Sequence, residues 1–299
     1  MRTFVFTCLL LLGMTTFAQD ANFHIYLCLG QSNMEGNAKV EEQDTVAVDS
    51  RFQVLAAVDC PNLGRTKGNW YKAVPPLARC YTGLTPGDYF GRAMVANLPS
   101  NVRVGIINVA VGGCRIELFD KDNYQSYVET SPDWLKNMVK EYGGNPYARL
   151  VEMAKLAQKD GVIKGILLHQ GESNTNDKDW PLKVKGVYDN LLNDLGLSAA
   201  NVPLLAGEVV HADQNGVCAS MNTIIDSLPQ VIPTAHVISS AGCPAAFDNL
   251  HFTAEGYRML GARYAAKMLS ILGYGDWTSA QNMKLWYNRP AQDWLEALP

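Results

Sequence analysis

Five short apolar runs, separated by segments of helical periodicity, constrain the fold of this 299-residue chain more than any other feature. The runs have the length and composition of buried strands, and they cover residues 23–29, 102–111, 162–169, 202–210 and 236–239. The helical segments are 87–97, 147–158, 183–195, 218–228 and 254–272. This alternation predicts an α/β fold, a three-layer α/β/α sandwich with a five-stranded parallel sheet of the flavodoxin-like kind.

The first eighteen residues have the order of a secretory signal peptide. Arg2 precedes an apolar run over residues 4–13, and small residues lead up to Ala18. We therefore expect residues 1–18 to be removed and the protein to be secreted or periplasmic. No later apolar stretch approaches the roughly 20 residues that span a bilayer, and the net charge of −4 comes with no long basic run. Neither a membrane nor nucleic acid is an expected partner.

Six of the seven cysteines follow the expected signal peptide, and an even number in an oxidising compartment permits disulfides. The pairs that lie in loop-like sequence are Cys60 with Cys80 and Cys218 with Cys243. The sequence has no Cys-x-x-Cys or His-x-x-x-His spacing, so we expect no metal and no other cofactor.

A serine follows the first apolar run, in the segment GQSNMEG at residues 30–36. Ser32 would lie on a glycine-bounded turn at the carboxyl end of a strand, where an exposed nucleophile belongs, although such a serine can also be a helix N-cap. The elbow of α/β-hydrolases requires G-x-S-x-G, and Met34 replaces its second glycine. The sequence therefore disfavours that fold.

A carboxylate and a histidine stand three residues apart near the other end of the domain, at Asp248 and His251. They come directly before the last helical segment, for which Thr253 is the expected N-cap. A carboxylate that binds one ring nitrogen leaves the other nitrogen to accept a serine proton. Together with Ser32, this spacing predicts an acyl-transfer site.

Two polar or glycine-rich segments follow the second and third apolar runs. VGGCR at residues 111–115 can direct backbone N–H groups at an oxyanion, and HQGESN at residues 169–174 gathers polar side chains. Either segment alone could be an ordinary turn or capping loop. Because parallel strands end at the same edge of a sheet, we expect both to border the serine.

The ordered blocks GQSNMEG, GGC, HQGESN and DNLH resemble those of the SGNH-hydrolase superfamily. Within it the chain is similar to the sialate O-acetylesterase-like carbohydrate esterases, including carbohydrate esterase family six, over about residues 23–272. The resemblance implies an esterase domain over residues 19–272, with Ser32 as nucleophile and His251 as general base. It also implies the backbone N–H groups of Ser32 and Gly113 as oxyanion donors.

Three roles stay open at this point. Where typical members carry an asparagine as third oxyanion donor, this chain has HQGE, so Gln170 is the first choice and Asn174 the reserve. Asp248 is favoured as partner of His251, with Glu172 as the alternative. Arg115 is expected to position the glycine loop or the substrate, or else to form a structural salt bridge.

The resemblance implies removal of acetyl groups from carbohydrate through an acyl-enzyme. A lipid or aryl esterase of the same superfamily is one alternative, but a lipid esterase would show an apolar lid, whereas the aperiodic excursion over residues 39–84 is mostly polar and aromatic. A non-catalytic glycan-binding module is the other alternative. Such a module would be expected to have lost Ser32 or His251, and both are present.

The last fifteen residues, LWYNRPAQDWLEALP at 285–299, resemble the opening of the amino-terminal domain of glycoside hydrolase family ninety-five, the α-L-fucosidases and their relatives. The resemblance implies a linker over residues 273–284 and a covalently linked fucosidase-like domain. It would point to an acetylated, fucosylated plant polysaccharide as substrate. The alternative is an aromatic tail that packs back on the esterase.

Overall fold

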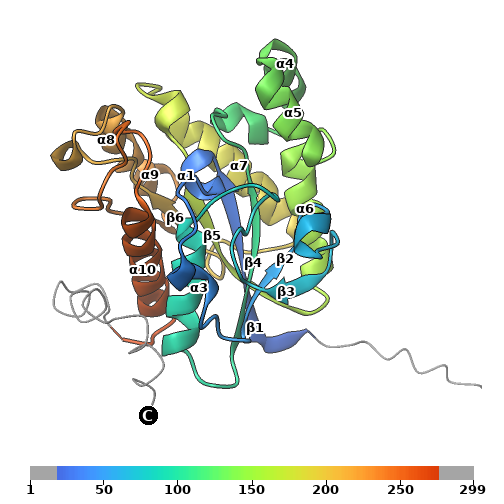
Figure 1. Cartoon of the computed structure of the whole chain (residues 1–299). Helices are drawn as coiled ribbons and strands as arrows, with labels where there is room; N and C mark the ends of the chain where they lie inside the picture. Colours follow the sequence, from blue (N-terminus) through green and yellow to red (C-terminus); the bar gives the residue numbers. More distant parts are fainter. Residues whose placement is uncertain (1–18, 276–299) are drawn as a thin grey trace, which may run out of the picture.

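A seven-stranded sheet forms the centre of the computed structural model, which describes residues 19–275 (Figure 1). The strand order is β3-β2-β4-β1-β5-β6-β7; β3 is antiparallel to β2, and all other neighbours are parallel. The strands are β1 Asp20–Gly30, β2 Phe52–Leu55, β3 Trp70–Lys72, β4 Arg103–Ala110, β5 Gly161–His169, β6 Leu204–Gly207 and β7 Ala235–Ile238.

The five predicted strands are present as β1 and β4 to β7, but the prediction of a five-stranded, wholly parallel sheet is wrong. The two additional strands, β2 and β3, come from the excursion over residues 39–84 and extend one edge of the sheet. They are only four and three residues long, and β3 is half-buried. Strands this short carry little periodicity, so long-range pairing rather than local pattern defines them.

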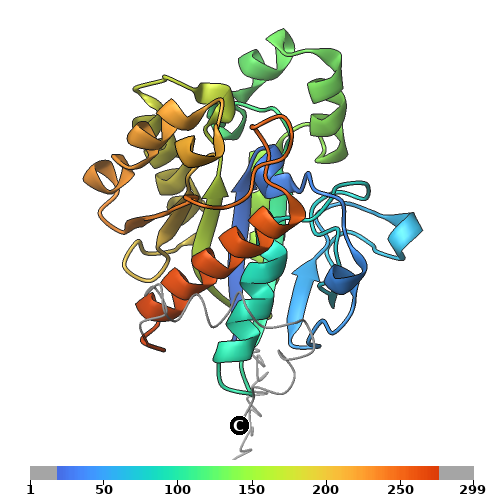
Figure 2. The same cartoon turned by 60° about the vertical axis from the view of Figure 1, so that its left-hand side comes forward.

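Helices cover both faces of the sheet (Figures 1 and 2). The helices are α1 Ser32–Glu35, α2 Glu42–Thr45, α3 Pro86–Asn97, α4 Tyr124–Thr130, α5 Asp133–Glu141, α6 Pro146–Ala157, α7 Trp180–Leu195, α8 Asn222–Ile225, α9 Leu228–Val231 and α10 Ala254–Ile271. Successive residues of β1 enter opposite cores: Ile25 and Leu27 pack with α6 and α7, whereas Tyr26 and Cys28 pack with α3 and α10. The three-layer arrangement follows from this burial of β1 on both sides.

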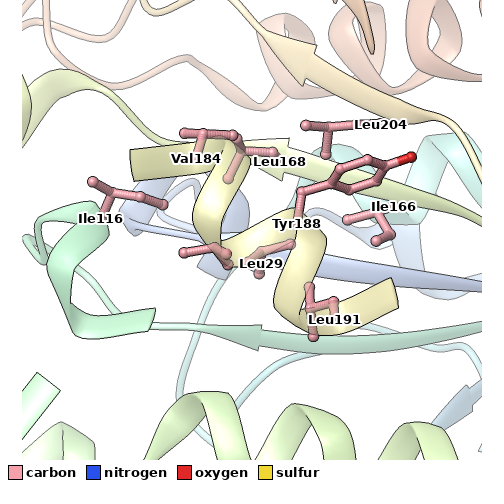
Figure 3. Close-up of a pocket in the computed structure, with 9 residues that line it drawn as sticks. Leu29, Ile116, Ile166, Leu168, Val184, Tyr188, Leu191 and Leu204 are labelled. Carbon is pink, nitrogen blue, oxygen red and sulfur yellow. The ribbon is translucent and has the colours of Figure 1, made fainter. Parts of the chain in front are cut away.

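Helix α7 shows how tightly one of these layers is packed. Val184, Tyr188 and Leu191 point from α7 onto the sheet, and they line a small apolar cavity together with strand residues such as Leu29 and Leu168 (Figure 3). Every side chain that lines this cavity is apolar apart from the tyrosine hydroxyl. The cavity is therefore part of the core and holds none of the predicted site residues.

Four of the five predicted helices are confirmed as α3, α6, α7 and α10, each ending within three residues of its predicted bounds. The continuous helix predicted over residues 218–228 is wrong. That segment is a 3₁₀ turn followed by the short helices α8 and α9, and Pro229 occupies the first turn of α9. Pro229 has no N–H to donate to the carbonyl of Ile225, so one continuous helix cannot pass through it, whereas the first turn of a new helix does not need that N–H. Helices α4 and α5 were not predicted.

The carboxyl end of β1 lies unusually close to β5. Gly30 has φ +144°, and a Cβ on it would lie 2.0 Å from the carbonyl oxygen of His169. Only glycine fits this position. Because the two strand ends lie together here, the start of α1 at Ser32 lies beside the segment that follows β5. The predicted meeting of these two blocks is therefore a consequence of backbone packing.

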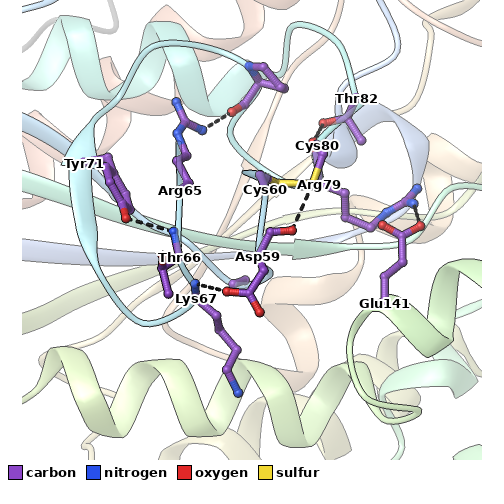
Figure 4. Close-up of a disulfide and its surroundings, with 12 residues drawn as sticks. Asp59, Cys60, Arg65, Thr66, Lys67, Tyr71, Arg79, Cys80, Thr82 and Glu141 are labelled. Carbon is purple, nitrogen blue, oxygen red and sulfur yellow. Dashed lines mark hydrogen bonds and ion pairs between the residues drawn. A yellow bond between two sulfur atoms is a disulfide. The ribbon is translucent and has the colours of Figure 1, made fainter. Parts of the chain in front are cut away.

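One of the two proposed disulfides is present, between Cys60 and Cys80 (Figure 4). The proposed pair Cys218 and Cys243 is wrong, because both are free thiols. Cys243 is buried in the core shared with α10, whereas the Cys218 thiol is directed at the carbonyl of Glu172. Loop-like sequence identified cysteines that lie outside the helices and strands, but not which residues lie beside them in space.

The signal peptide predicted for residues 1–18 and the fucosidase-like segment predicted for residues 285–299 lie outside the described residues, as does most of the linker. Between residues 19 and 275, no helix is long and apolar enough to cross a membrane.

The thiol assignment makes a first prediction. For protein that begins at residue 19, denaturation without reductant should expose four titratable thiols, and reduction should raise the count to six, because one bond joins two of the six cysteines. Replacing Cys60 and Cys80 with serine should lower the free energy of unfolding by about 3 kcal/mol, since the bond closes a loop of 20 residues. Cys218→Ser is the matched control, with little expected effect. A count of two thiols before reduction would contradict the assignment.

Candidate active site

Ser32, His251 and Asp248 form a continuous hydrogen-bonded line. His251 Nε2 lies 2.9 Å from Ser32 Oγ, and His251 Nδ1 lies 2.7 Å from Asp248 Oδ2. The serine opens α1 after β1, whereas the other two residues lie in the loop between β7 and α10. A histidine held between a hydroxyl and a carboxylate can accept a proton from the hydroxyl and be stabilised as imidazolium by the carboxylate.

The loop that carries His251 is folded by Asp248 itself. Asp248 Oδ1 accepts the backbone N–H groups of Leu250 and His251, each at 3.0 Å, which leaves Oδ2 for the imidazole. Asn249, between them, has φ +53°, a conformation that asparagine tolerates. Partial burial favours the neutral acid, but hydrogen bonds from the His251 N–H, the imidazole and the Leu250 N–H outweigh it and lower the pKa of Asp248. The three-residue spacing therefore builds an Asx turn, and Thr253 caps α10 as predicted.

Glu172 does not contact His251, contrary to the alternative considered for it. Its carboxylate accepts a hydrogen bond from Asn33 Nδ2 and lies 3.7 Å from His169 Nε2, with both partners buried. Asn33 also donates to the carbonyl of Leu250 and accepts from Tyr257. Glu172 therefore orients Asn33, which joins the serine turn to the histidine loop.

The glycine loop after β4 is held at two of its atoms. The Gly112 N–H donates to Glu35 Oε2 at 3.1 Å, and the Gly113 carbonyl accepts from Ser173 Oγ at 3.0 Å. Gly113 itself is exposed, and its N–H has no acceptor among the described residues. The Ser32 N–H likewise has no acceptor there. Gly113 has φ +70°, so a glycine is favoured there. Two backbone donors are thus available for a negatively charged oxygen.

Glu35 is held in turn by Arg79. Its Oε1 accepts from Arg79 Nε at 3.0 Å and from Nη2 at 2.6 Å, and both side chains are nearly buried. Arg79 precedes the bonded Cys80 and also contacts Glu141 of α5 (Figure 4). Burial raises the pKa of Glu35, and Arg79 and the Gly112 N–H only partly offset it. Neither Glu35 nor Arg79 was predicted as a site residue, although Glu35 lies in the GQSNMEG block and Arg79 beside a disulfide.

Gln170 and Asn174 do not fit the role of a third oxyanion donor. The Gln170 amide donates to Gln31 Oε1, the Cys114 carbonyl and Asn174 Oδ1, and Asn174 donates to Glu117 and Asp177. Both residues are about 1% exposed, so their donors are consumed inside the protein. They stabilise the loop after β5.

Gln31 has a side-chain amide at this site whose N–H₂ group donates to no other described residue. Its Oε1 accepts from Gln170 and from the Ser173 N–H, which fixes the orientation of the amide. Within the described part of the chain its Nε2 has no acceptor, and the protein does not fully enclose this nitrogen. Because Gln31 directly precedes Ser32, this N–H₂ group adds to the donor capacity beside the two backbone groups.

Arg115 forms the structural salt bridge rather than a contact with the triad. Its guanidinium lies 3.4 Å from Glu117 and 3.6 Å from Asp177, and the side chain is 45% exposed. Its backbone N–H donates to Tyr127. Among residues 19–275 no group of three or more acidic, histidine or cysteine side chains is arranged to hold a metal ion.

Comparison with known proteins identifies the family. The sequence profile of the family described as "Carbohydrate esterase, sialic acid-specific acetylesterase" matches residues 22–270. The chain belongs to this family. It is accordingly a carboxylic ester hydrolase of the carbohydrate acetylesterase kind, as the resemblance of its four sequence blocks implied.

Relatives of this carbohydrate esterase include a protein of Arabidopsis thaliana named "Probable carbohydrate esterase", 25% identical over an alignment of 264 residues that covers 82% of this chain and 90% of the relative. The crystal structure of an Arabidopsis thaliana protein has a TM-score of 0.64 at 21% identity, covering 84% of this chain and 99% of that one. NanS has a TM-score of 0.59 at 15% identity, covering 86% and 99%. A carbohydrate acetylesterase of Xanthomonas citri has a TM-score of 0.57 at 18% identity, covering 83% and 56%. These structures share the fold.

The buried pair in this esterase makes a second prediction. Arg79→Met should lower the free energy of unfolding by about 3 kcal/mol at neutral pH, because it leaves the Glu35 carboxylate buried without its counter-charge. A folded-state pKa above the unfolded value means that the folded protein binds more protons. The loss of unfolding free energy in Arg79→Met should therefore be smallest below the ordinary glutamate pKa of about 4.3. It should grow as pH rises through the folded-state pKa of Glu35.

Urea denaturation between pH 4.5 and 8 measures this dependence. Arg115→Met is the matched control, since its partly exposed ion pairs should contribute less than about 1 kcal/mol. Equal, pH-independent losses in the two variants would contradict the role assigned to Arg79.

Proposed function

We propose that this protein is a serine esterase that removes O-acetyl groups from carbohydrate through an acetyl-enzyme. The observation that carries the proposal is the hydrogen-bonded line from Ser32 through His251 to Asp248, with both distances below 3 Å. Family membership supports the class of substrate.

In the proposed mechanism Ser32 Oγ attacks the ester carbonyl while His251 Nε2 accepts the serine proton. The resulting oxyanion accepts hydrogen bonds from the backbone N–H groups of Ser32 and Gly113, with the Gln31 amide as the side-chain donor nearest to Ser32 in sequence. Collapse expels the sugar oxygen, which takes the proton from His251. Water, deprotonated by His251, then attacks the acetyl group, and acetate leaves as Ser32 regains its proton.

The substrates proposed are acetylated plant polysaccharides or oligosaccharides, or acetylated sialic acid. Export through the segment 1–18 remains part of the proposal, and so does a fucosidase-like partner domain after the segment 285–299, on the sequence features described above. Large acetylated polysaccharides lie outside cells, so a secreted or periplasmic location would suit them.

The third prediction tests the nucleophile and base. Ser32→Ala and His251→Ala should each reduce kcat for an acetyl ester by at least about 10⁴-fold, and the double variant should lose little more, because the two residues act as one unit. Acetate release from a soluble acetylated oligosaccharide measures this, with unfolding curves to show that the variants fold. A serine variant that retained a tenth of the rate would contradict the assignment. Tyr274→Ala, just after the C-terminal end of α10, is the control.

The fourth prediction separates the two carboxylates. Asp248→Asn should lower kcat by about 10³- to 10⁴-fold, because an amide favours the wrong histidine tautomer. Glu172→Gln should instead act mainly on stability, by about 1–3 kcal/mol, since it disturbs a buried hydrogen bond with Asn33. Parallel measurement of kcat and of urea midpoints ranks the two variants. If Glu172→Gln had the larger effect on kcat, the supporting role would pass to Glu172.

A further inference from the structure

An exposed tryptophan lies directly on the oxyanion loop. Trp134 of α5 is 51% exposed, while its neighbours Leu135 and Val139 on the same helix are buried. A Cβ placed on Gly113 would lie 2.6 Å from Trp134 Cη2, so the indole covers one side of this glycine. About half of this large ring is thus open to solvent beside the loop proposed to bind the oxyanion.

Two further exposed aromatic side chains lie on loops that join the site. Phe247, fully exposed, directly precedes Asp248. Tyr81 is 89% exposed and follows Cys80, whose other neighbour Arg79 holds Glu35. Trp134, Phe247 and Tyr81, here called the aromatic rim, are three of the four exposed aromatic side chains within residues 19–275. They come from three separate segments, and each segment also holds a residue of the site or of its support.

The chemistry of the rim fits a sugar ring better than an acyl chain. An aromatic face carries negative charge density and packs against the weakly positive C–H groups on a pyranose face. An acyl chain would instead need a continuous apolar groove, whereas each of the three rings has a polar residue on one side in sequence, namely Thr82, Asp133 and Asp248. Flat, separated rings among polar groups suit an amphipathic ligand.

The position of Trp134 relative to the carbonyl site determines which ring it would meet. The ester carbonyl must lie at the Gly113 N–H for its oxygen to be stabilised, and the acetylated sugar carbon is two bonds from the carbonyl carbon. Since Trp134 contacts Gly113, the sugar that bears the acetyl group comes within reach of the indole.

We propose that Trp134 forms a pyranose-binding subsite next to the acetyl group, with Phe247 and Tyr81 as its outer contacts. This inference rests on the function proposed above and adds to it the ring form of the substrate. Stacking contributes to binding in the ground and transition states alike, so its loss should raise KM more than it lowers kcat.

The test compares two acetyl esters that differ in ring structure, glycerol triacetate and glucose pentaacetate, by acetate release. For Trp134→Leu, the ratio of kcat/KM for the pyranose to that for the acyclic ester should fall about tenfold, mainly through KM. Trp134→Phe should restore most of the ratio, because it keeps an aromatic face. Phe247→Ala should lower the ratio less, and Tyr274→Ala, which lies away from the site, should leave it unchanged.

The outcomes separate this inference from the proposed function. If Trp134→Leu lost activity equally on both esters, the indole would only support the oxyanion loop, and the subsite would be wrong. An unchanged ratio would also overturn the subsite while leaving the esterase proposal intact. If the unaltered enzyme cleaved glycerol triacetate but no acetylated pyranose, the carbohydrate function would fall, and the subsite with it. Thermal unfolding of each variant identifies a loss caused by misfolding.

Discussion

The buried amide of Asn33 is the interaction on which the arrangement of this site depends. Its Nδ2 donates to Glu172 and to the Leu250 carbonyl, and its Oδ1 accepts from Tyr257. These partners belong to the loop after β5, the histidine loop and α10, which are far apart in sequence. A buried amide is costly unless its hydrogen-bonding groups are paired, so the three segments are held in one relative position. The serine next to Asn33 and the histidine next to Leu250 thereby come within hydrogen-bonding distance.

Sequence predicted the parts of the fold that are encoded locally. β1, β4 and β5 read as continuous apolar runs because both faces of a central parallel strand are covered. β2 and β3 escaped prediction because they are very short, and because β2 joins the sheet by pairing with β4, far along the chain, while β3 forms the edge. The failed pairing of Cys218 with Cys243 has the same origin. Each cysteine sits in loop-like sequence, but one enters the core beside α10 and the other faces the loop after β5, which only the tertiary structure determines.

The catalytic candidates were predictable because each follows a strand or precedes a helix, so topology brings them to one edge. The D-x-x-H spacing also specifies its own turn, since Asp248 accepts the N–H groups that fold the chain back to His251. Donor roles were harder to predict. Gln170 and Gln31 are both amides beside the site, and the difference between them is that Trp180 and Asn174 engage Gln170 from within the core. That orientation depends on packing and has no sequence signal.

The chain divides acyl chemistry and substrate recognition between different segments. The groups proposed to act on the ester lie at strand ends common to the fold, and nothing about them would distinguish one acetyl ester from another. Discrimination is therefore expected from segments around that edge, among them the loop closed by Cys60 and Cys80, and helix α5. Arg79 joins these two segments, because it contacts Glu141 on α5 as well as Glu35 behind the oxyanion loop. A movement of either segment would thus reach Glu35 and the Gly112 N–H through one buried guanidinium, whereas a change of an exposed side chain on α5 leaves these contacts in place, so recognition can change with little effect on the rate.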